Sequence, residues 1–159
     1  MEHPLDRVIA AIAQDTNLRI HEIDIENLVG NGILNVESVR SVRNKYESAI
    51  PLSSRDIVVV AAGPQNKRAV YEGWGNAIYQ WRKGKDGADN AMLDFFQGFK
   101  NIDVFSHIFI ASGDGGLAPI AEEATSHGID TTIVTLTGQK SWKLNAYESI
   151  NLANVKEIK

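Results

Sequence analysis

The sequence predicts an α/β sandwich with a mostly parallel central sheet. Two observations support this prediction: strand patterns alternate with amphipathic helices about five times, and two of the strands have the composition of buried strands. Residues 56–62 form a continuous apolar strand and residues 106–111 another buried strand, and continuous apolar runs are typical of parallel strands that helices cover on both faces. The chain has 159 residues, so we expect a single domain over residues 1–159.

The elements in the first half of the chain follow from their local patterns. Apolar residues at helical spacing predict a short helix over 5–14, and an alternating run predicts a strand over 18–24. Asn35 precedes an apolar i, i+3 stripe with charged residues on the opposite face. We therefore expect a helix from Val36 to Ala49 with Asn35 as its N-cap.

The second half of the chain continues the alternation of helices and strands. Gly128 follows the last helical stripe and is typical of the position after a helix. The predicted helices are 67–74, 88–99 and 117–127, and the predicted strands are 77–81, 106–111, 131–136 and 154–158.

Composition and charge exclude several classes of protein. Hydrophobic residues make up 43% of the chain and charged residues 23%, which excludes wholesale disorder. The absence of cysteine excludes a disulfide scaffold, a zinc ribbon and a cysteine nucleophile, and it fits a cytoplasmic protein. The formal charge of −4 provides no general attraction to nucleic acid. We expect no signal peptide and no membrane span, because no apolar run approaches the required length.

Acidic residues follow three of the predicted strands. Asp24 ends the first strand, Asp86 and Asp89 follow the third, and Asp114 follows the fourth. In an open parallel sheet, ligands bind beyond the carboxyl ends of the strands. Carboxylates brought together there repel one another unless a cation neutralises them, and hard oxygen ligands favour Mg²⁺ or Mn²⁺.

Each acid also has a purely structural alternative role. Asp86 and Asp89 are suited to cap the following helix or to interact with its dipole, and Asp114 is suited to cap the helix after it. Asp24 is harder to explain in this way, because it directly follows an apolar strand. The hypothesis of a metal site therefore rests on the three strand ends taken together.

Three ordered motifs resemble the NYN family of PIN-like ribonucleases. Asp24-Ile25-Glu26-Asn27 resembles the family's D-x-x-N opening, and Gly84 to Asp89 resembles its K-x-x-D element. Ser112-Gly113-Asp114 resembles its S-G-D strand end. The resemblance covers residues 18 to 158 and implies a PIN-like, Rossmannoid three-layer α/β/α sandwich. It further implies metal-dependent cleavage of RNA phosphodiester bonds.

The resemblance also implies roles for individual residues. Asp24, Asp89 and Asp114 would be the catalytic, metal-binding acids, Asp86 an accessory metal ligand, and Asn27 a polar partner near the metal or phosphate. Many family members carry another acid two residues after the S-G-D aspartate, where this chain has Gly116. We therefore expect slow cleavage, or a domain that binds RNA, a nucleotide or a protein partner without cutting.

Basic residues near the predicted site are candidates for contacts with the phosphates of single-stranded RNA. The basic candidates are Arg82, Lys83, Lys85, Lys140 and Lys143. Ser112 and Asn27 are further predicted substrate contacts. Trp142 lies between Lys140 and Lys143 and could stack on a base, but burial against the rest of the fold is the more common role for tryptophan.

Two other enzyme or binding classes compete with the ribonuclease hypothesis. Ser112 to Gly116 resembles the G-G-D-G loop of NAD and lipid kinases, in which glycines let the backbone approach a phosphate. A Rossmann-like binder of small molecules would need Gly-x-Gly-x-x-Gly after the first strand, where Asp24 to Asn27 stands instead. The sequence leaves open whether the protein forms a homo-oligomer.

Overall fold

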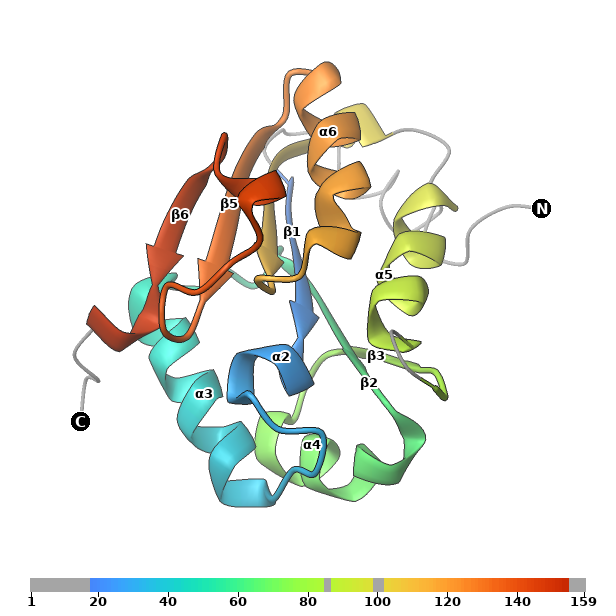
Figure 1. The fold of residues 1–159 in the computed structure, drawn as a ribbon, viewed down its shortest axis with the longest axis vertical. Coiled ribbons are helices and arrows are strands. Elements are labelled where there is room, and N and C mark those ends of the chain that lie inside the picture. Colours follow the sequence, from blue (N-terminus) through green and yellow to red (C-terminus); the bar gives the residue numbers. More distant parts are fainter. Residues whose placement is uncertain (1–17, 85–86, 99–101, 155–159) are drawn as a thin grey trace.

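Six parallel strands form the centre of the molecule (Figure 1). The structure is a computed structural model and describes residues 18–84, 87–98 and 102–154. The strand order is β3-β2-β1-β4-β5-β6, the order of a doubly wound sheet. The strands are β1 (Leu18–Asp24), β2 (Ile57–Ala62), β3 (Ile78–Trp81), β4 (Phe105–Ala111), β5 (Asp130–Thr135) and β6 (Glu148–Asn151).

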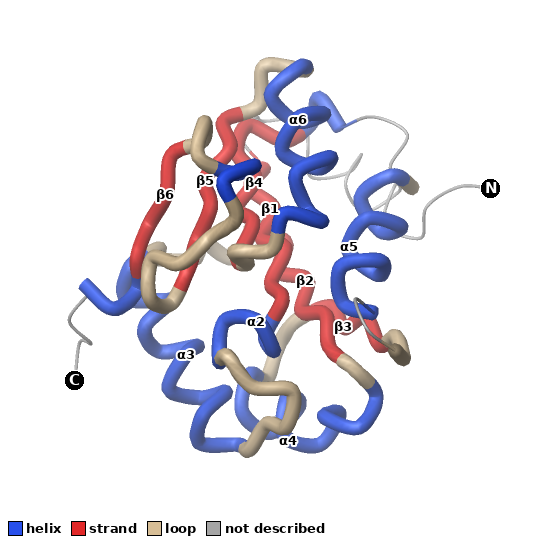
Figure 2. Tube along the Cα trace, viewed as in Figure 1, coloured by secondary structure: helices blue, strands red, loops and turns tan. Residues whose placement is uncertain are grey.

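Helices cover both faces of this sheet, which confirms the predicted α/β sandwich (Figure 2). One face packs against α5 and α6, and the other packs against α3 and α4, while the short α2 follows β1 directly. The helices are α2 (Ile25–Val29), α3 (Val36–Ala49), α4 (Lys67–Trp74), α5 (Gly87–Gln97) and α6 (Ala118–Ser126). Short 3₁₀ turns are η2 (Pro64–Asn66), η3 (Ile102–Val104), η4 (Gly115–Leu117), η5 (Trp142–Leu144) and η6 (Leu152–Asn154).

Most predicted elements lie where the sequence patterns indicate. Asn35 caps α3 as expected, because its side chain accepts a hydrogen bond from the Ser38 backbone N–H, and Ser38 completes a capping box. Gly128 follows α6 with a positive φ of 75°. The predicted helix over 5–14 lies outside the described residues.

The last strand is the clearest error of the sequence analysis. The strand predicted over 154–158 is wrong at Asn154, which belongs to η6, while residues 155–159 lie outside the described part. The final strand is instead β6 (Glu148–Asn151), whose residues are exposed or half-buried at the edge of the sheet. Its mixed polar sequence has no alternating apolar pattern, so periodicity could not identify it.

The order in which strands are added to the sheet reverses after β3, and this places β4 beside β1. The first three strands extend outward from β1 on one side, and β4 to β6 extend outward on the other. In this arrangement the helices after β1 and β4 diverge, which leaves space at the carboxyl ends of these two strands. The motifs at Asp24 and Ser112 therefore meet, although 88 positions separate them in sequence.

A buried polar network lies near the amino-terminal ends of β1 and β2. His21 stacks on Phe109 and is fully buried, with Tyr46 OH 2.6 Å from its Nδ1 and Asp56 Oδ2 2.9 Å from its Nε2. Arg19 also pairs with Asp56, with Nη2 and Oδ2 2.5 Å apart. This network joins β1, α3 and the start of β2.

No helix among the described residues is long and apolar enough to cross a membrane.

Candidate functional site

Asp24 stands at the carboxyl end of β1 and begins α2. Its side chain is 5% exposed, and its Oδ1 accepts a hydrogen bond from the Asn27 backbone N–H at 3.2 Å. Asp24 is therefore the N-cap of α2, a five-residue helix that ends at Gly30 with φ 81°. The same helix turns the side chain of Asn27 toward β4.

Ser112 connects the two acidic strand ends. Its Oγ lies 3.5 Å from Asp24 Oδ2 and accepts a hydrogen bond from the Asp114 backbone N–H at 3.1 Å. Ser112 is fully buried, so its place in the structure is that of a positioning residue rather than of the predicted substrate contact. A second link runs from the Gly113 backbone N–H to Asn27 Oδ1 at 2.9 Å. The D-x-x-N and S-G-D motifs thus form one hydrogen-bonded unit.

Asp114 is half-buried and caps the next turn. Its Oδ1 accepts a hydrogen bond from the Gly116 backbone N–H at 2.8 Å, which makes Asp114 the N-cap of η4. This confirms that the capping role proposed from the sequence is present. Capping uses one carboxylate oxygen, and Oδ2 keeps its capacity to bind a cation.

The glycines around Asp114 make room for protein backbone. A Cβ at Gly113 would lie 2.3 Å from the carbonyl oxygen of Gln139, and one at Gly115 would lie 2.6 Å from Ser141 Oγ. The Ser141 backbone N–H donates to the Gly113 carbonyl at 2.8 Å. The segment after β5 therefore covers these glycines. A kinase-type loop needs its glycines open to a phosphate, so this packing argues against the kinase alternative.

The close approach at Gly113 gives a testable expectation. Gly113→Ala is expected to lower the free energy of unfolding by roughly 1–3 kcal/mol, because the new methyl group forces the Gln139 backbone away. Urea denaturation measures this change. Gly32→Ala is the matched control, because no atom of the described residues lies within 4 Å of its Cβ position. Equal stability of the two variants would contradict the packing described for the loop.

The other predicted acids are only partly described. Asp89 belongs to the first turn of α5, but its side chain lies outside the described residues, as does all of Asp86. Helix α5 begins shortly after the end of β3 and packs against β2 and η4. The first turn of α5 therefore begins at the carboxyl end of the strands, where Asp24 and Asp114 also lie.

Basic candidates flank these strand ends on both sides. Arg82 and Lys83 are exposed after β3, and Arg82 forms an ion pair with Asp94 of α5. Lys143 is exposed after β5, while Lys140 donates to Ser149 Oγ at 3.0 Å. Lys85 lies outside the described residues.

A metal site is not complete within the described part of the chain. Those residues contain no group of three or more acidic, histidine or cysteine side chains that could hold an ion. Asp24 and Asp114, joined through Ser112, supply two carboxylates of the hard-oxygen type that suits Mg²⁺ or Mn²⁺. The predicted convergence of Asp24, Asp89 and Asp114 on one ion stays a prediction.

Glu22 is an acid that the sequence analysis missed. Alternate residues of a strand share a face, so Glu22 lies on the same face of β1 as Asp24. It pairs in register with Val59 and Ile110 and is fully buried, and neither carboxylate oxygen has a hydrogen-bond partner among the residues that the structure describes. Burial raises its pKa well above the usual value for glutamate. An acid inside an otherwise apolar strand is the signal that could have identified it.

The raised pKa of Glu22 predicts a dependence of stability on pH. The folded protein keeps the Glu22 proton at pH values where the unfolded chain releases it, so stability falls as pH rises above about 4.3. The loss is about 1.4 kcal/mol per pH unit until the folded carboxyl ionises. Glu22→Gln has no such proton to lose. The free energy of unfolding of Glu22→Gln, measured by urea denaturation, should therefore rise relative to that of the wild type from about pH 5 to pH 7. A difference that stays constant would contradict the buried, protonated carboxyl.

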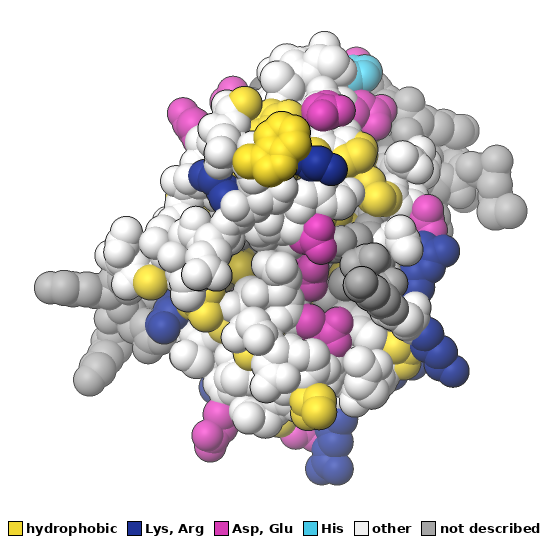
Figure 3. Space-filling model, in the orientation of Figure 1, with side chains coloured by type: hydrophobic (Ala, Val, Ile, Leu, Met, Phe, Trp, Pro, Cys, Tyr) yellow, Lys and Arg dark blue, Asp and Glu magenta, His cyan; other side chains and the backbone are white. Residues whose placement is uncertain are grey.

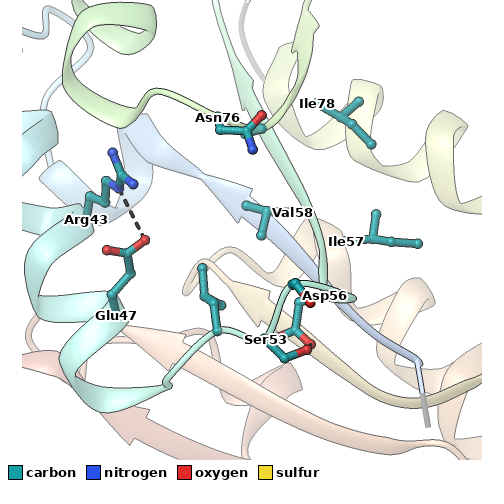
Figure 4. A pocket seen from close by; sticks show the side chains of 11 residues that line it. Arg43, Glu47, Ser53, Asp56, Ile57, Val58, Asn76 and Ile78 are labelled. Carbon is teal, nitrogen blue, oxygen red and sulfur yellow. Dashed lines mark hydrogen bonds and ion pairs between the residues drawn. The ribbon is translucent and has the colours of Figure 1, made fainter.

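A separate hollow of about 380 Å³ lies near the amino-terminal ends of β2 and β3 (Figure 4). Arg43 and Glu47 point toward each other on one side of it, with Arg43 Nε 3.2 Å from Glu47 Oε1. Ser53 Oγ donates to Asp56 Oδ1 at 2.9 Å on another side. These polar groups are paired within the protein. The hollow lies at the amino-terminal end of the strands, whereas Asp24 and Asp114 lie at the carboxyl end. We therefore place the candidate site at the carboxyl ends of β1 and β4.

No family model matches this chain, and neither the curated proteins nor the solved structures include a significant match to it.

Proposed function

We propose that this protein is a ribonuclease that requires Mg²⁺ or Mn²⁺ and cleaves phosphodiester bonds in single-stranded RNA. The observation that supports the proposal best is the link from Asp24 through Ser112 to Asp114 at the adjoining ends of β1 and β4. The link reaches Asp114 through its backbone N–H, and two carboxylates that meet beyond these strand ends would favour a bound divalent cation.

The residues around this link have separate roles in the proposal. Asp24 and Asp114 hold the cation, with Asp89 as the proposed third ligand, and the bound cation supplies charge neutralisation and an activated water. Ser112 fixes the relative position of Asp24 and Asp114. Asn27 Oδ1 is engaged by Gly113, which leaves its Nδ2 group to donate to a substrate phosphate.

A second candidate function is binding of RNA without cleavage. The observation that favours it is Gly116, which has no side-chain carboxylate at a position where many members of the resembled family carry an acid. One potential cation ligand is thus missing from this chain. This candidate keeps the phosphate contacts and loses the turnover.

One experiment separates the two candidates. The purified protein is incubated with end-labelled single-stranded RNA in Mg²⁺, in Mn²⁺ and in EDTA, and binding is measured in parallel in EDTA. The ribonuclease proposal expects slow cleavage with either metal and none in EDTA. Binding without cleavage in any metal would favour the second candidate, and the absence of both would reject the two together.

A further inference from the structure

An exposed tryptophan lies next to the candidate site. Trp142 is 76% exposed, so the expected burial of this side chain is wrong. Figure 3 shows hydrophobic side chains near η5 and α6 with Lys or Arg side chains beside them. A large aromatic side chain on the surface is informative when it stands in a defined groove with charged neighbours.

The turn that carries Trp142 is firmly anchored. Leu144 of the same turn is fully buried in the core, and Ser141 caps the turn by accepting from the Lys143 backbone N–H at 3.3 Å. The Ser141 backbone N–H also bonds to Gly113. Neighbouring residues fix the turn, and the Trp142 ring is therefore held largely in solvent. Leu144, and not Trp142, packs the turn against the core.

The surroundings of Trp142 match a nucleotide. A groove of about 440 Å³ is bordered by Trp142 and Lys143 together with Gly115 and Gly116, the residues directly after Asp114. The Lys143 side chain crosses Gly115, with its Cδ 3.2 Å from the Cβ position there. An aromatic face for a base and a cation for a phosphate thus stand beside the proposed cleavage site. Glu122 borders the groove as well, which favours placing the phosphates on the Lys143 side.

We infer that Trp142 is a stacking platform for an unpaired base of a single-stranded nucleic acid, and that Lys143 binds the adjoining phosphate. This inference rests on the proposed function, because it places a base of the substrate next to the nucleotide at Asp114. Stacking requires an open base face, so the platform selects single strands over duplexes. It is tolerant of base identity, because every base has such a face.

The test measures binding in EDTA, where cleavage cannot interfere. Oligouridylate, oligoadenylate, their DNA counterparts and an RNA duplex are titrated against the wild type, Trp142→Ala, Trp142→Phe and Lys143→Ala. Ile33→Ala is the control for loss of an exposed apolar side chain, since Ile33 is 80% exposed. Intrinsic tryptophan fluorescence reports stacking as the difference in quenching between the wild type and Trp142→Ala, because the buried Trp74 and the half-buried Trp81 are present in both.

The expected result is specific to single strands. Trp142→Ala should weaken their binding about 5- to 150-fold and remove most of the fluorescence quenching, while Trp142→Phe retains part of both. Lys143→Ala should lower the slope of log affinity against log salt by about one. Ile33→Ala should bind like the wild type.

Three outcomes would overturn the inference. The first is wild-type affinity in Trp142→Ala, and the second is no binding of any single strand by the wild type. The third is self-association of the wild type that Trp142→Ala abolishes, measured by sedimentation, without an effect on nucleic acid; the groove would then be a contact between copies. Binding through Trp142 without turnover would reject the ribonuclease proposal alone, and turnover unchanged by Trp142→Ala would reject the platform alone.

Discussion

RNA cleavage is expected to fall at least about 100-fold when Asp114 is replaced by asparagine, while the fold stays intact. Asparagine keeps the oxygen that accepts from the Gly116 backbone N–H, so η4 keeps its cap. The substitution removes the negative charge on which the proposed cation binding depends. Loss of partners that only orient metal ligands already costs about 10- to 100-fold, so loss of a ligand itself should cost at least as much.

The comparison needs a matched control for the change in charge. Asp130→Asn makes the same substitution at an exposed residue at the amino-terminal end of β5, whereas Asp114 follows the carboxyl end of the neighbouring parallel strand β4. Single-turnover cleavage in Mn²⁺ should be unchanged in Asp130→Asn, and urea denaturation should give similar stabilities for both variants and the wild type. Full activity of Asp114→Asn would mean that the measured cleavage comes from another site or from a contaminant.

Local patterns in the sequence predict most of this fold. The strand β1 is an alternating run that ends at a polar residue, β2 and β4 are largely apolar runs that end at glycine or polar residues, and α3 has an apolar stripe after a capping residue. These signals depend on neighbouring residues alone, which is why they can be found without a structure. Helix α2 gives no such signal, because its five residues are too few to form a stripe.

The sequence also predicts which residues end the strands, but it does not predict which ends meet. Asp24 and Ser112 lie together because β4 pairs with β1 rather than with β3, the strand before it in the chain. That choice depends on how all the helices cover the sheet, which no local pattern encodes. The prediction that Asp24 and Asp114 lie at the same end of the sheet is correct because all strands of a parallel sheet end on the same side. The linking role of Ser112 could only be seen in the structure.

One side chain was misjudged and another was missed, because burial depends on neighbours distant in sequence. Trp142 was expected in the core, but Leu144 fills that position in its turn and leaves the ring outside. Glu22 is buried on the face where Ile20 contributes to the core, and it has no hydrogen-bond partner in the described part of the chain. Residue type gives the average environment of tryptophan or glutamate, and both residues here depart from that average.

Asp56→Ala is expected to lower the free energy of unfolding by about 3 kcal/mol, the largest effect on stability among the changes considered. The Asp56 side chain is 4% exposed and accepts from Arg19, from Ser53 and from Nε2 of the buried His21. Removal leaves His21 without its acceptor and Arg19 without its counter-charge. The value stands at the low end for a buried pair, because 29% of the Arg19 side chain is exposed and water replaces part of the interaction.

Asp94→Ala is the control for this prediction, because it removes an aspartate whose pair with Arg82 is exposed on both sides. Its cost should stay below about 1 kcal/mol in the same urea titration. Asp56→Asn should fall between the two, since it keeps an oxygen that accepts from His21 but loses the charge opposite Arg19. A loss of less than about 1 kcal/mol in Asp56→Ala would mean that the network contributes little to folding.

The pKa of Asp56 gives this prediction a second, independent signature. Burial alone would raise that pKa, but hydrogen bonds from His21, Arg19 and Ser53 outweigh burial and hold it well below its usual range. The ionised carboxylate therefore stabilises the fold fully above the unfolded pKa of about 3.9, and this contribution is lost as pH falls through the lower folded pKa. The difference in stability between the wild type and Asp56→Ala should accordingly be large at about pH 7 and shrink below about pH 4. A difference that stays constant into strong acid would show that Asp56 acts through packing rather than through its charge.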